Sequence, residues 1–254
     1  MPISIYVRDI VTSGKIGTVE RVFSDVSIGG PPPEERFEDS HRLVNPDLAG
    51  GALLDTGIYA LTWVFQTLYT TQTNPRPPTL SSAIRKYRLG TDQSTCMLLT
   101  FPREKEGDAH GIATCSLRVN SNPGGKDEAG PCIRVQGTKG EVQVFPPAHN
   151  PDRSKLILHD GTVEEKDWSH HPGPGKGSGF VNGFGDETYP EGDGMGMFWE
   201  ADECAHAIRD GRKEGRLESL EESLTIMKVM DEVRRQADFG FPDHLESTDF
   251  PLDF

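Results

Sequence analysis

The 254-residue sequence lacks the features that mark several specialised classes of protein. None of its four cysteines stands in a C-x-x-C pair, so we predict no zinc or other metal site and interpret the cysteines as small buried thiols. The N-terminus has no basic segment before an apolar core, and no apolar run approaches membrane length. We therefore expect a reduced, cytoplasmic protein that has no signal peptide and no membrane partner.

Positive charge is also scarce. Lys and Arg total 26 residues against 40 Asp and Glu, which gives a net charge of −14. A field of that sign repels phosphate groups, so nucleic acid is excluded as a predicted partner. The 28 glycines and 19 prolines indicate many turns and loops in an otherwise globular composition.

A dinucleotide-binding fingerprint is missing as well. No Gly-x-Gly-x-x-Gly string follows a predicted strand and opens a predicted helix. The nearest glycine-rich strings, at 173–177 and 192–196, lie in a stretch at 169–196 that we interpret as a long loop. The sequence therefore predicts no complete Rossmann domain and assigns no cofactor-binding residue.

The hydrophobic pattern that is present predicts an α+β fold. Helical spacing falls at 2–13, 54–70, 198–210 and 219–237. Alternating or β-branched strings predict strands at 18–28, 80–89, 94–101, 111–119, 132–137, 141–145 and 155–159. We expect a large, open, mainly antiparallel sheet with one face covered by the helices at 54–70, 198–210 and 219–237.

Two polar side chains stand out in the apolar pattern at 54–70. Asp55 and Tyr59 are spaced i and i+4, which places them on one face of a helix, one turn apart. A carboxylate beside a phenol has the chemistry of a proton-transfer pair. The residues alone leave two structural roles open, a carboxylate that stabilises the helix N-terminus and a tyrosine that packs in the core.

Five strings, in order along the chain, resemble the C-terminal part of the Gfo/Idh/MocA family of oxidoreductases. They are SGKIGTVERVF at 13–23, HRLVNPDLAGGALLDTGIY at 41–59, VQGTKG at 135–140, GMFWEADE at 196–203 and EESLTIMKVMDEVR at 221–234. The branch they resemble contains the dimeric dihydrodiol dehydrogenases and the fungal NADP-dependent D-xylose dehydrogenases. We accordingly assign 1–240 to one domain of this C-terminal type and 241–254 to a tail.

The resemblance implies an oxidoreductase that moves a hydride between NADP(H) and a sugar or diol carbinol. Asp55 and Tyr59 fall on the family's catalytic pair, in which Tyr59 would handle the proton of the substrate hydroxyl and Asp55 would orient it. Arg42 and Trp63 are the candidate substrate-binding residues. Arg42 could instead form a salt bridge, and Trp63 could instead pack in the core.

The resemblance also implies a lysine, from a Glu-Lys-Pro motif in a nucleotide-binding domain, that activates the tyrosine. A free tyrosine is a poor base at neutral pH, and a nearby cation improves it. The 254 residues hold no Glu-Lys-Pro string, so we expect a truncated enzyme that is impaired on its own.

Two other functions stay open from the sequence. One is a non-catalytic oligomerisation or binding module, and the other is a redox-independent isomerase or cyclase that uses the same pocket. The family further implies a small carbohydrate or diol substrate and a homodimer formed through the open face of the sheet.

Overall fold

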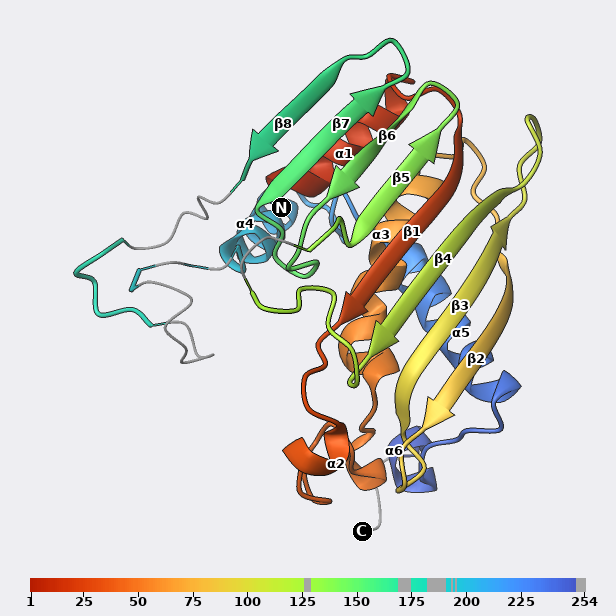
Figure 1. The fold of residues 1–254 in the computed structure, drawn as a ribbon, viewed down its shortest axis with the longest axis vertical. Coiled ribbons are helices and arrows are strands. Elements are labelled where there is room, and N and C mark those ends of the chain that lie inside the picture. The colour runs from red at the N-terminus through yellow and green to blue at the C-terminus, as the bar shows by residue number, and fades with distance from the viewer. Residues whose placement is uncertain (126–128, 169–174, 182–190, 193, 195, 250–254) are drawn as a thin grey trace.

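The computed structural model describes residues 1–125, 129–168, 175–181, 191–192, 194 and 196–249. Within them, one eight-stranded sheet organises the molecule (Figure 1). The strands are β1 (Val19–Ser27), β2 (Thr79–Lys86), β3 (Asp92–Phe101), β4 (Ala109–Ser116), β5 (Ile133–Gly137), β6 (Gly140–Val144), β7 (Arg153–Leu158) and β8 (Val163–Asp167). Their spatial order is β2-β3-β4-β1-β5-β6-β7-β8, so the first strand of the chain lies in the middle.

The pairing of the strands is antiparallel everywhere in this sheet except between β1 and β4. These two strands run parallel because the chain leaves β1, passes through helices and the β2–β3 hairpin, and only then reaches β4. Parallel neighbours need such a long crossover. The prediction of a mainly antiparallel, open sheet is confirmed. The sequence analysis missed β8, whose charged string VEEKD resembles a loop but suits an exposed sheet edge.

The helices of the described residues leave one face of the sheet uncovered (Figure 1). They are α1 (Pro2–Thr12), α2 (Pro33–Arg36), α3 (Ile58–Leu68), α4 (Phe198–Arg209), α5 (Leu220–Gln236) and α6 (Asp243–Glu246), with a 3₁₀ turn at Pro46–Leu48 and a π-helical turn at Leu53–Gly57. α3 packs on β1 and β4, and α5 packs on β2 beside α3. Figure 1 shows α1 behind the half of the sheet that contains β6 and β7.

α3 is the central helix of the core. Its buried side chains include Phe65, which is fully buried and meets the ring of Phe101 edge-on at 5.4 Å between centroids. The helix approaches the sheet closely at Gly111 of β4, where a Cβ would lie 2.4 Å from Cγ1 of Val64. The absence of a side chain at Gly111 therefore lets α3 sit directly on the central strands.

α5 divides its surface between core and solvent. It begins with a side-chain cap, since Ser219 Oγ accepts a hydrogen bond from the backbone N–H of Glu222 at 3.1 Å. Its inner face buries Ile226, Val229, Met230 and Val233. Its outer face exposes Leu220, Leu224 and Met227.

α4 forms where the sequence predicts a helix, but its expected packing is wrong. Of the predicted apolar stripe, Ala201 and Ala205 are exposed, and the side chain of Ile208 is 79% exposed. The buried residue of α4 is Ala207 instead. Thus α1, rather than α4, joins α3 and α5 in covering the sheet.

The prediction that the cysteines are buried holds for two of the four. Cys115 and Cys132 are buried, and burial raises the pKa of both thiols. Cys96 and Cys204 are exposed, so the interpretation of all four as buried thiols is wrong for these two. Cys96 lies on a strand face that the helices do not cover, and Cys204 lies on the open side of α4.

The segment Pro46–Leu68 is long and apolar enough to cross a membrane, although the sequence analysis saw no apolar run of that length. In the structure this segment is broken at Gly50 and Gly51 into separate turns and α3. Its most apolar window is 61% buried, which is the behaviour of a core helix in a folded domain.

The predicted loop at 169–196 falls largely outside the described residues, as do its two histidines and parts of both glycine-rich strings. The predicted division of the chain at residue 240 remains a prediction. Beyond that point the described residues include the short helix α6, whose Glu246 pairs with Arg234 of α5 at 2.6 Å.

Candidate functional site

The site predicted around Asp55 starts in a π-helical turn rather than in a regular α-helix. The turn runs over Leu53–Gly57 and continues directly into α3. The hydroxyl of Thr56 donates to the carbonyl of Ala52 at 2.9 Å, and a Cβ at Gly57 would stand 3.1 Å from Cys115 Sγ. Single π-helical turns within helices are often found at functional positions. The sequence pattern of the helix gave no sign of this turn.

Arg42 and Asp55 are brought together by the fold. An Arg42 guanidinium nitrogen donates to Asp55 Oδ1 at 2.6 Å, and the side chains are 66% and 26% exposed respectively. The sequence analysis left both a substrate contact and a salt bridge open for Arg42, and the structure shows the salt bridge. An exposed ion pair adds little to stability, so its effect here is to orient the carboxylate.

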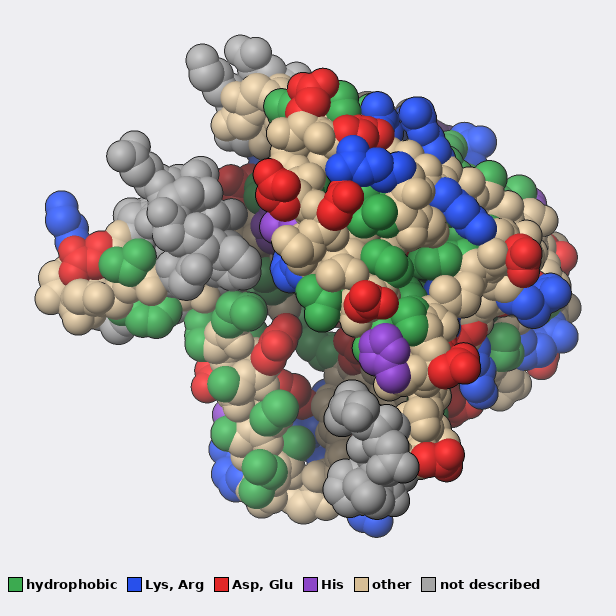
Figure 2. All heavy atoms as spheres, turned by 90° about the horizontal axis from the view of Figure 1, so that it is seen from below, with side chains coloured by type: hydrophobic (Ala, Val, Ile, Leu, Met, Phe, Trp, Pro, Cys, Tyr) green, Lys and Arg blue, Asp and Glu red, His purple; other side chains and the backbone are tan. Residues whose placement is uncertain are grey.

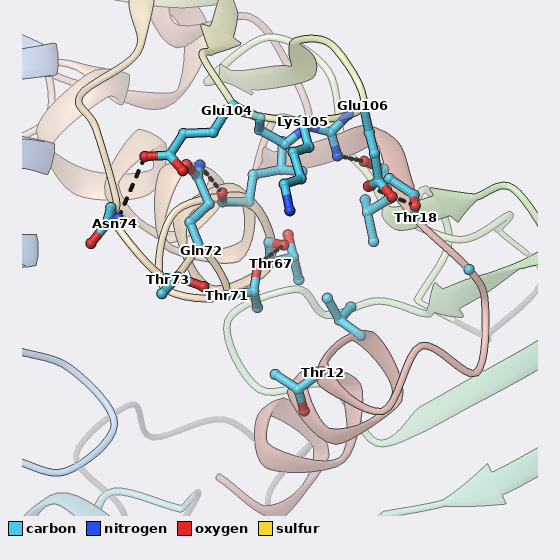
Figure 3. Close-up of a pocket in the computed structure, with 15 residues that line it drawn as sticks. Thr12, Thr18, Thr67, Thr71, Gln72, Thr73, Asn74, Glu104, Lys105 and Glu106 are labelled. Carbon is cyan, nitrogen blue, oxygen red and sulfur yellow. Dashed lines mark hydrogen bonds between the residues drawn. The ribbon is translucent and has the colours of Figure 1, made fainter.

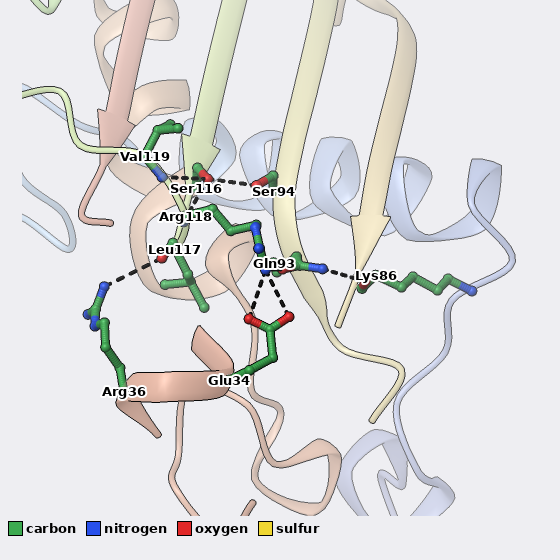
Figure 4. Close-up of polar contacts among 9 residues, drawn as sticks. All are labelled: Glu34, Arg36, Lys86, Gln93, Ser94, Ser116, Leu117, Arg118 and Val119. Atoms are coloured by element: carbon green, nitrogen blue, oxygen red, sulfur yellow. Dashed lines mark hydrogen bonds and ion pairs between the residues drawn. The ribbon is translucent and has the colours of Figure 1, made fainter. Parts of the chain in front are cut away.

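The segment that carries Arg42 is held by a polar network at the ends of β3 and β4 (Figure 4). Arg118 donates to both carboxylate oxygens of Glu34 in α2, at 2.8 and 2.9 Å, and to the side-chain carbonyl of Gln93 at 2.8 Å. Arg36 donates to the carbonyls of Ile28 and Leu117. α2 is thereby fixed against the sheet, which limits where the following loop can place Arg42.

Tyr59 lies one turn beyond Asp55 and is 45% exposed, so its phenol is reachable from solvent. Its ring meets the imidazole of His149 edge-on, with 6.2 Å between ring centroids. Among the described residues, Asp55 bonds to Arg42 and Tyr59 contacts His149. The two predicted catalytic residues therefore share one helix end but have different neighbours.

Trp63 is placed in the core, where its side chain is 6% exposed. Its indole N–H donates to the carbonyl of Ala148 at 3.1 Å. This bond anchors the loop between β6 and β7, which carries His149 toward Tyr59. A direct substrate contact by Trp63 remains a prediction, while the structure shows that Trp63 positions a loop of the site.

His149 is a site residue that the sequence analysis missed. It lies in the string FPPAHNP between two predicted strands, and nothing in that string links it to Tyr59. Its outer surface is exposed, yet desolvation by the surrounding chain lowers its pKa below the usual histidine value. The lowered pKa favours the neutral imidazole, which can both donate and accept a proton.

A separate pocket of about 430 Å³ lies at the other end of α3 (Figure 3). It is lined by the end of α1, the end of α3 and the loop between β3 and β4, and threonines contribute much of its surface. Thr67 and Thr71 donate their hydroxyl protons to carbonyls of α3 itself. Thr67 lies eight residues beyond Tyr59, roughly 12 Å along a helix, so this pocket is distinct from the Asp55 site.

The end of the molecule to which the N-terminus of α3 points is uneven. Figure 2 looks onto this end and shows that its surface is hollowed. An exposed phenol, an ion pair and a histidine thus lie at one end of the fold. A phenol beside an imidazole has the chemistry needed for proton transfer.

The fold is that of a known family of domains, and the chain belongs to the Gfo/Idh/MocA family. Residues 5–143 match the family model described as the GFO/IDH/MocA C-terminal domain. The family inferred from the five sequence strings is thereby confirmed.

Among curated relatives, a D-xylose 1-dehydrogenase (NADP(+)) of Hypocrea jecorina is 40% identical over 247 residues, which are 95% of this chain and 58% of the relative. A trans-1,2-dihydrobenzene-1,2-diol dehydrogenase of Bos taurus is 28% identical over 236 residues, 92% of this chain and 58% of the relative. The chain therefore spans about 58% of the length of these relatives.

Solved structures support the same fold. An NAD binding oxidoreductase from Klebsiella pneumoniae superposes with a TM-score of 0.64 at 17% identity, covering 93% of this chain and 61% of that one. An oxidoreductase from Sinorhizobium meliloti gives a TM-score of 0.61 at 18% identity, covering 93% and 59%.

The described residues do not fit a nicotinamide dinucleotide. Such a cofactor binds where a parallel strand turns through glycines into a helix, whose N-terminal N–H groups hold the pyrophosphate. Here the parallel pair β1 and β4 is not joined by a helix in that way, and the turn before α3 is occupied by the protein's own Asp92 carboxylate. No step of a reaction is therefore derived through a nucleotide on this chain.

Proposed function

We propose that this chain is the substrate-binding half of an NADP(H)-dependent oxidoreductase that acts on a sugar or a cyclic diol. The relatives' names and the 40% identity over almost the whole chain support this proposal. The observation that carries it is the exposed phenol of Tyr59 at the start of α3, beside the Arg42–Asp55 pair.

In this proposal the described residues bind and orient the substrate hydroxyl. Tyr59 exchanges the hydroxyl proton, because its phenol is exposed to solvent and to a bound substrate. Asp55, held by Arg42, fixes the orientation of the site. His149 limits the position of the Tyr59 ring, and its lowered pKa favours the neutral imidazole, which can accept the proton.

The nucleotide, in contrast, is held by a domain that lies outside these 254 residues. This division follows from the poor fit of the described residues to a dinucleotide. Hydride transfer then requires that domain, and the chain by itself is impaired.

The test measures two ligands on the purified chain. We expect D-xylose and a cyclic trans-diol to bind with millimolar affinity in calorimetric or NMR titrations, and the substitution Tyr59→Phe to weaken that binding by roughly tenfold, the loss of one hydrogen bond. Tyr69→Phe, at the other end of α3, is the matched control and should bind as the wild type does. We expect no saturable binding of NADPH at micromolar concentration.

The two arms fail in different ways. Equal binding by the wild type and Tyr59→Phe would remove Tyr59 from the site. Micromolar binding of NADPH would show instead that the chain holds the cofactor without a second domain, and the proposed division would be wrong.

We also propose that the open face of the sheet pairs with a second copy of the chain. On this face Phe23 of β1 lies opposite Ile112 of β4, and Ile112 lies opposite Leu98 of β3, which is 47% exposed. These three side chains form an apolar row on a face that no described helix covers.

Sedimentation velocity tests this pairing. Leu98→Asp places a charge in the apolar row, so we expect the dimer to dissociate to a monomer. Ile208→Asp, on the distant helix α4, should leave the sedimentation coefficient unchanged. A wild-type chain that sediments as a monomer at 100 micromolar, a concentration of the order at which weak dimers form, would contradict the proposal.

A further inference from the structure

Asp92 is a buried carboxylate that the candidate site does not expose. It begins β3 and is 2% exposed. One carboxylate oxygen, Oδ2, accepts hydrogen bonds from the backbone N–H of Leu53 at 2.7 Å and from the hydroxyl of Thr95 at 3.1 Å. Desolvation by burial raises the pKa of Asp92 to about 6, although these hydrogen bonds oppose the rise. At neutral pH the group is therefore ionised inside the protein.

The chain before α3 is shaped to receive this carboxylate. Gly51 has a φ of +139°, and a Cβ there would lie 2.0 Å from Asp92 Oδ1. A side chain at this position would displace the carboxylate, so glycine is required. Leu53 opens the π-helical turn, and its N–H is one of the groups at a helix N-terminus that have no partner within the helix. Asp92 supplies that partner from 39 residues away in the sequence.

The same end of β3 also holds the segment that carries Arg42. The hydroxyl of Thr91 donates to the carbonyl of Val44 at 3.3 Å. Thr91 and Asp92 are adjacent, so one corner of the sheet is bonded both to the segment of Arg42 and to the turn of Asp55. A shift of this corner would move the two partners of the ion pair relative to each other.

We propose that Asp92 is a positioning residue whose carboxylate sets the place of Asp55 and Tyr59 by fixing the first turn of their helix. The proposal rests on the proposed function for what Asp55 and Tyr59 do, and concerns only how they are held. Stability does not account for Asp92, because a buried acid with a raised pKa destabilises the fold when it ionises. Buried charges kept under such conditions are often found near functional sites.

Few other ionisable groups face Asp92. The thiol of Cys115 approaches from β4, and burial together with the Asp92 charge raises its pKa, so it stays neutral over the range of interest. Thr95 of β3 bonds to Asp92 and Thr56 of the π-helical turn bonds to Cys115, and neither hydroxyl titrates. A change near pH 6 at the Leu53 amide is therefore assigned to Asp92.

The experiment uses NMR on the whole chain without cofactor. In the wild type, we expect the Leu53 amide resonance to titrate with a midpoint near pH 6. Thr95→Val should raise that midpoint, because it removes a hydrogen bond that favours the ionised form. In Asp92→Asn the titration should vanish, and the amides of Asp55 and Tyr59 should shift. Hydrogen exchange at Leu53 should accelerate roughly 10- to 100-fold, with the rate at Val135 of β5 unchanged.

Asp25→Asn is the matched control. Asp25 is a half-buried carboxylate on the open face of the sheet, where it accepts hydrogen bonds from Ser27 and Thr114. It should leave Leu53, Asp55 and Tyr59 unaffected. Equal acceleration of exchange at Leu53 and Val135 would make Asp92 a general stabiliser and overturn the proposal, as would unshifted Asp55 and Tyr59 amides. If Asp92→Asn does not fold, the wild-type titration and Thr95→Val decide the outcome. None of these readouts depends on NADPH or substrate, so they stand apart from the tests of the proposed function.

Discussion

α3 and α4 have similar lengths and were both predicted from apolar residues at helical spacing, but the fold treats them differently. α3 buries seven of its residues between the sheet and its neighbours, whereas the buried residue of α4 is Ala207. α5 is intermediate, with one apolar face buried and another exposed. Helical spacing thus predicted where helices form, but did not predict which of them carry the core. Three substitutions test this ordering.

The largest effect is expected in α3. Phe65→Ala removes a fully buried ring that packs on Phe101 and Tyr69. The lost burial and the cavity that remains should lower the free energy of unfolding by about 3–5 kcal/mol. Urea denaturation followed by circular dichroism measures this change. A loss below about 1 kcal/mol would show that α3 is not the centre of the core.

An intermediate, pH-dependent effect is expected at the start of α5. Glu222 is 1% exposed, and burial, followed by the charge of Glu218, raises its pKa to about 7. The folded state therefore holds a proton that the unfolded state releases between about pH 4.5 and 7, so stability falls as the pH rises through that window. Glu222→Gln should be more stable than the wild type by about 1–2 kcal/mol at pH 8, after allowance for solvent screening, and equal to it near pH 4.

Denaturation at both pH values checks this result, and Glu221→Gln is the control, because its side chain is exposed on the same turn. An equal gain in the two variants would locate the effect in the net charge of the helix. Burial of Glu222 would then not be its cause.

The smallest effect is expected in α4. Ile208 is 79% exposed, so Ile208→Ser should change the free energy of unfolding by less than about 0.5 kcal/mol. The measurement is the same denaturation curve. A loss of 2 kcal/mol or more would show that this helix is covered in solution, and its place in the comparison would change.

The fold was largely predictable because its signals are local. Strand alternation and helical spacing each depend on neighbouring residues, and the structure confirms the strands and helices predicted from them. The sequence analysis did not predict β8, because an exposed edge strand needs no apolar residues. The packing of α4 was predicted wrongly, because the burial of a helix depends on what surrounds it. The periodicity of the sequence does not contain that information.

The candidate site was predictable only in part. Asp55 and Tyr59 were found because four residues separate them on one helix, and Arg42 was found because it precedes them in the same string. Their roles in catalysis remain predictions. His149 and Asp92 were not found, because they reach the site from β-strand ends and loops that lie 90 and 39 residues away from Tyr59 and Leu53 respectively.

The sequence by itself determined the class of fold, the family and the helix that bears Asp55 and Tyr59, because periodicity and ordered motifs are properties of the chain. Only the tertiary structure decided that Arg42 pairs with Asp55 and that Trp63 holds the loop of His149. It also decided that the Asp92 carboxylate accepts a hydrogen bond from the Leu53 N–H at the start of the helix. Each of these contacts joins side chains that the folded sheet brings together. Their geometry is set by the strand order and the packing of α3, which no local pattern encodes.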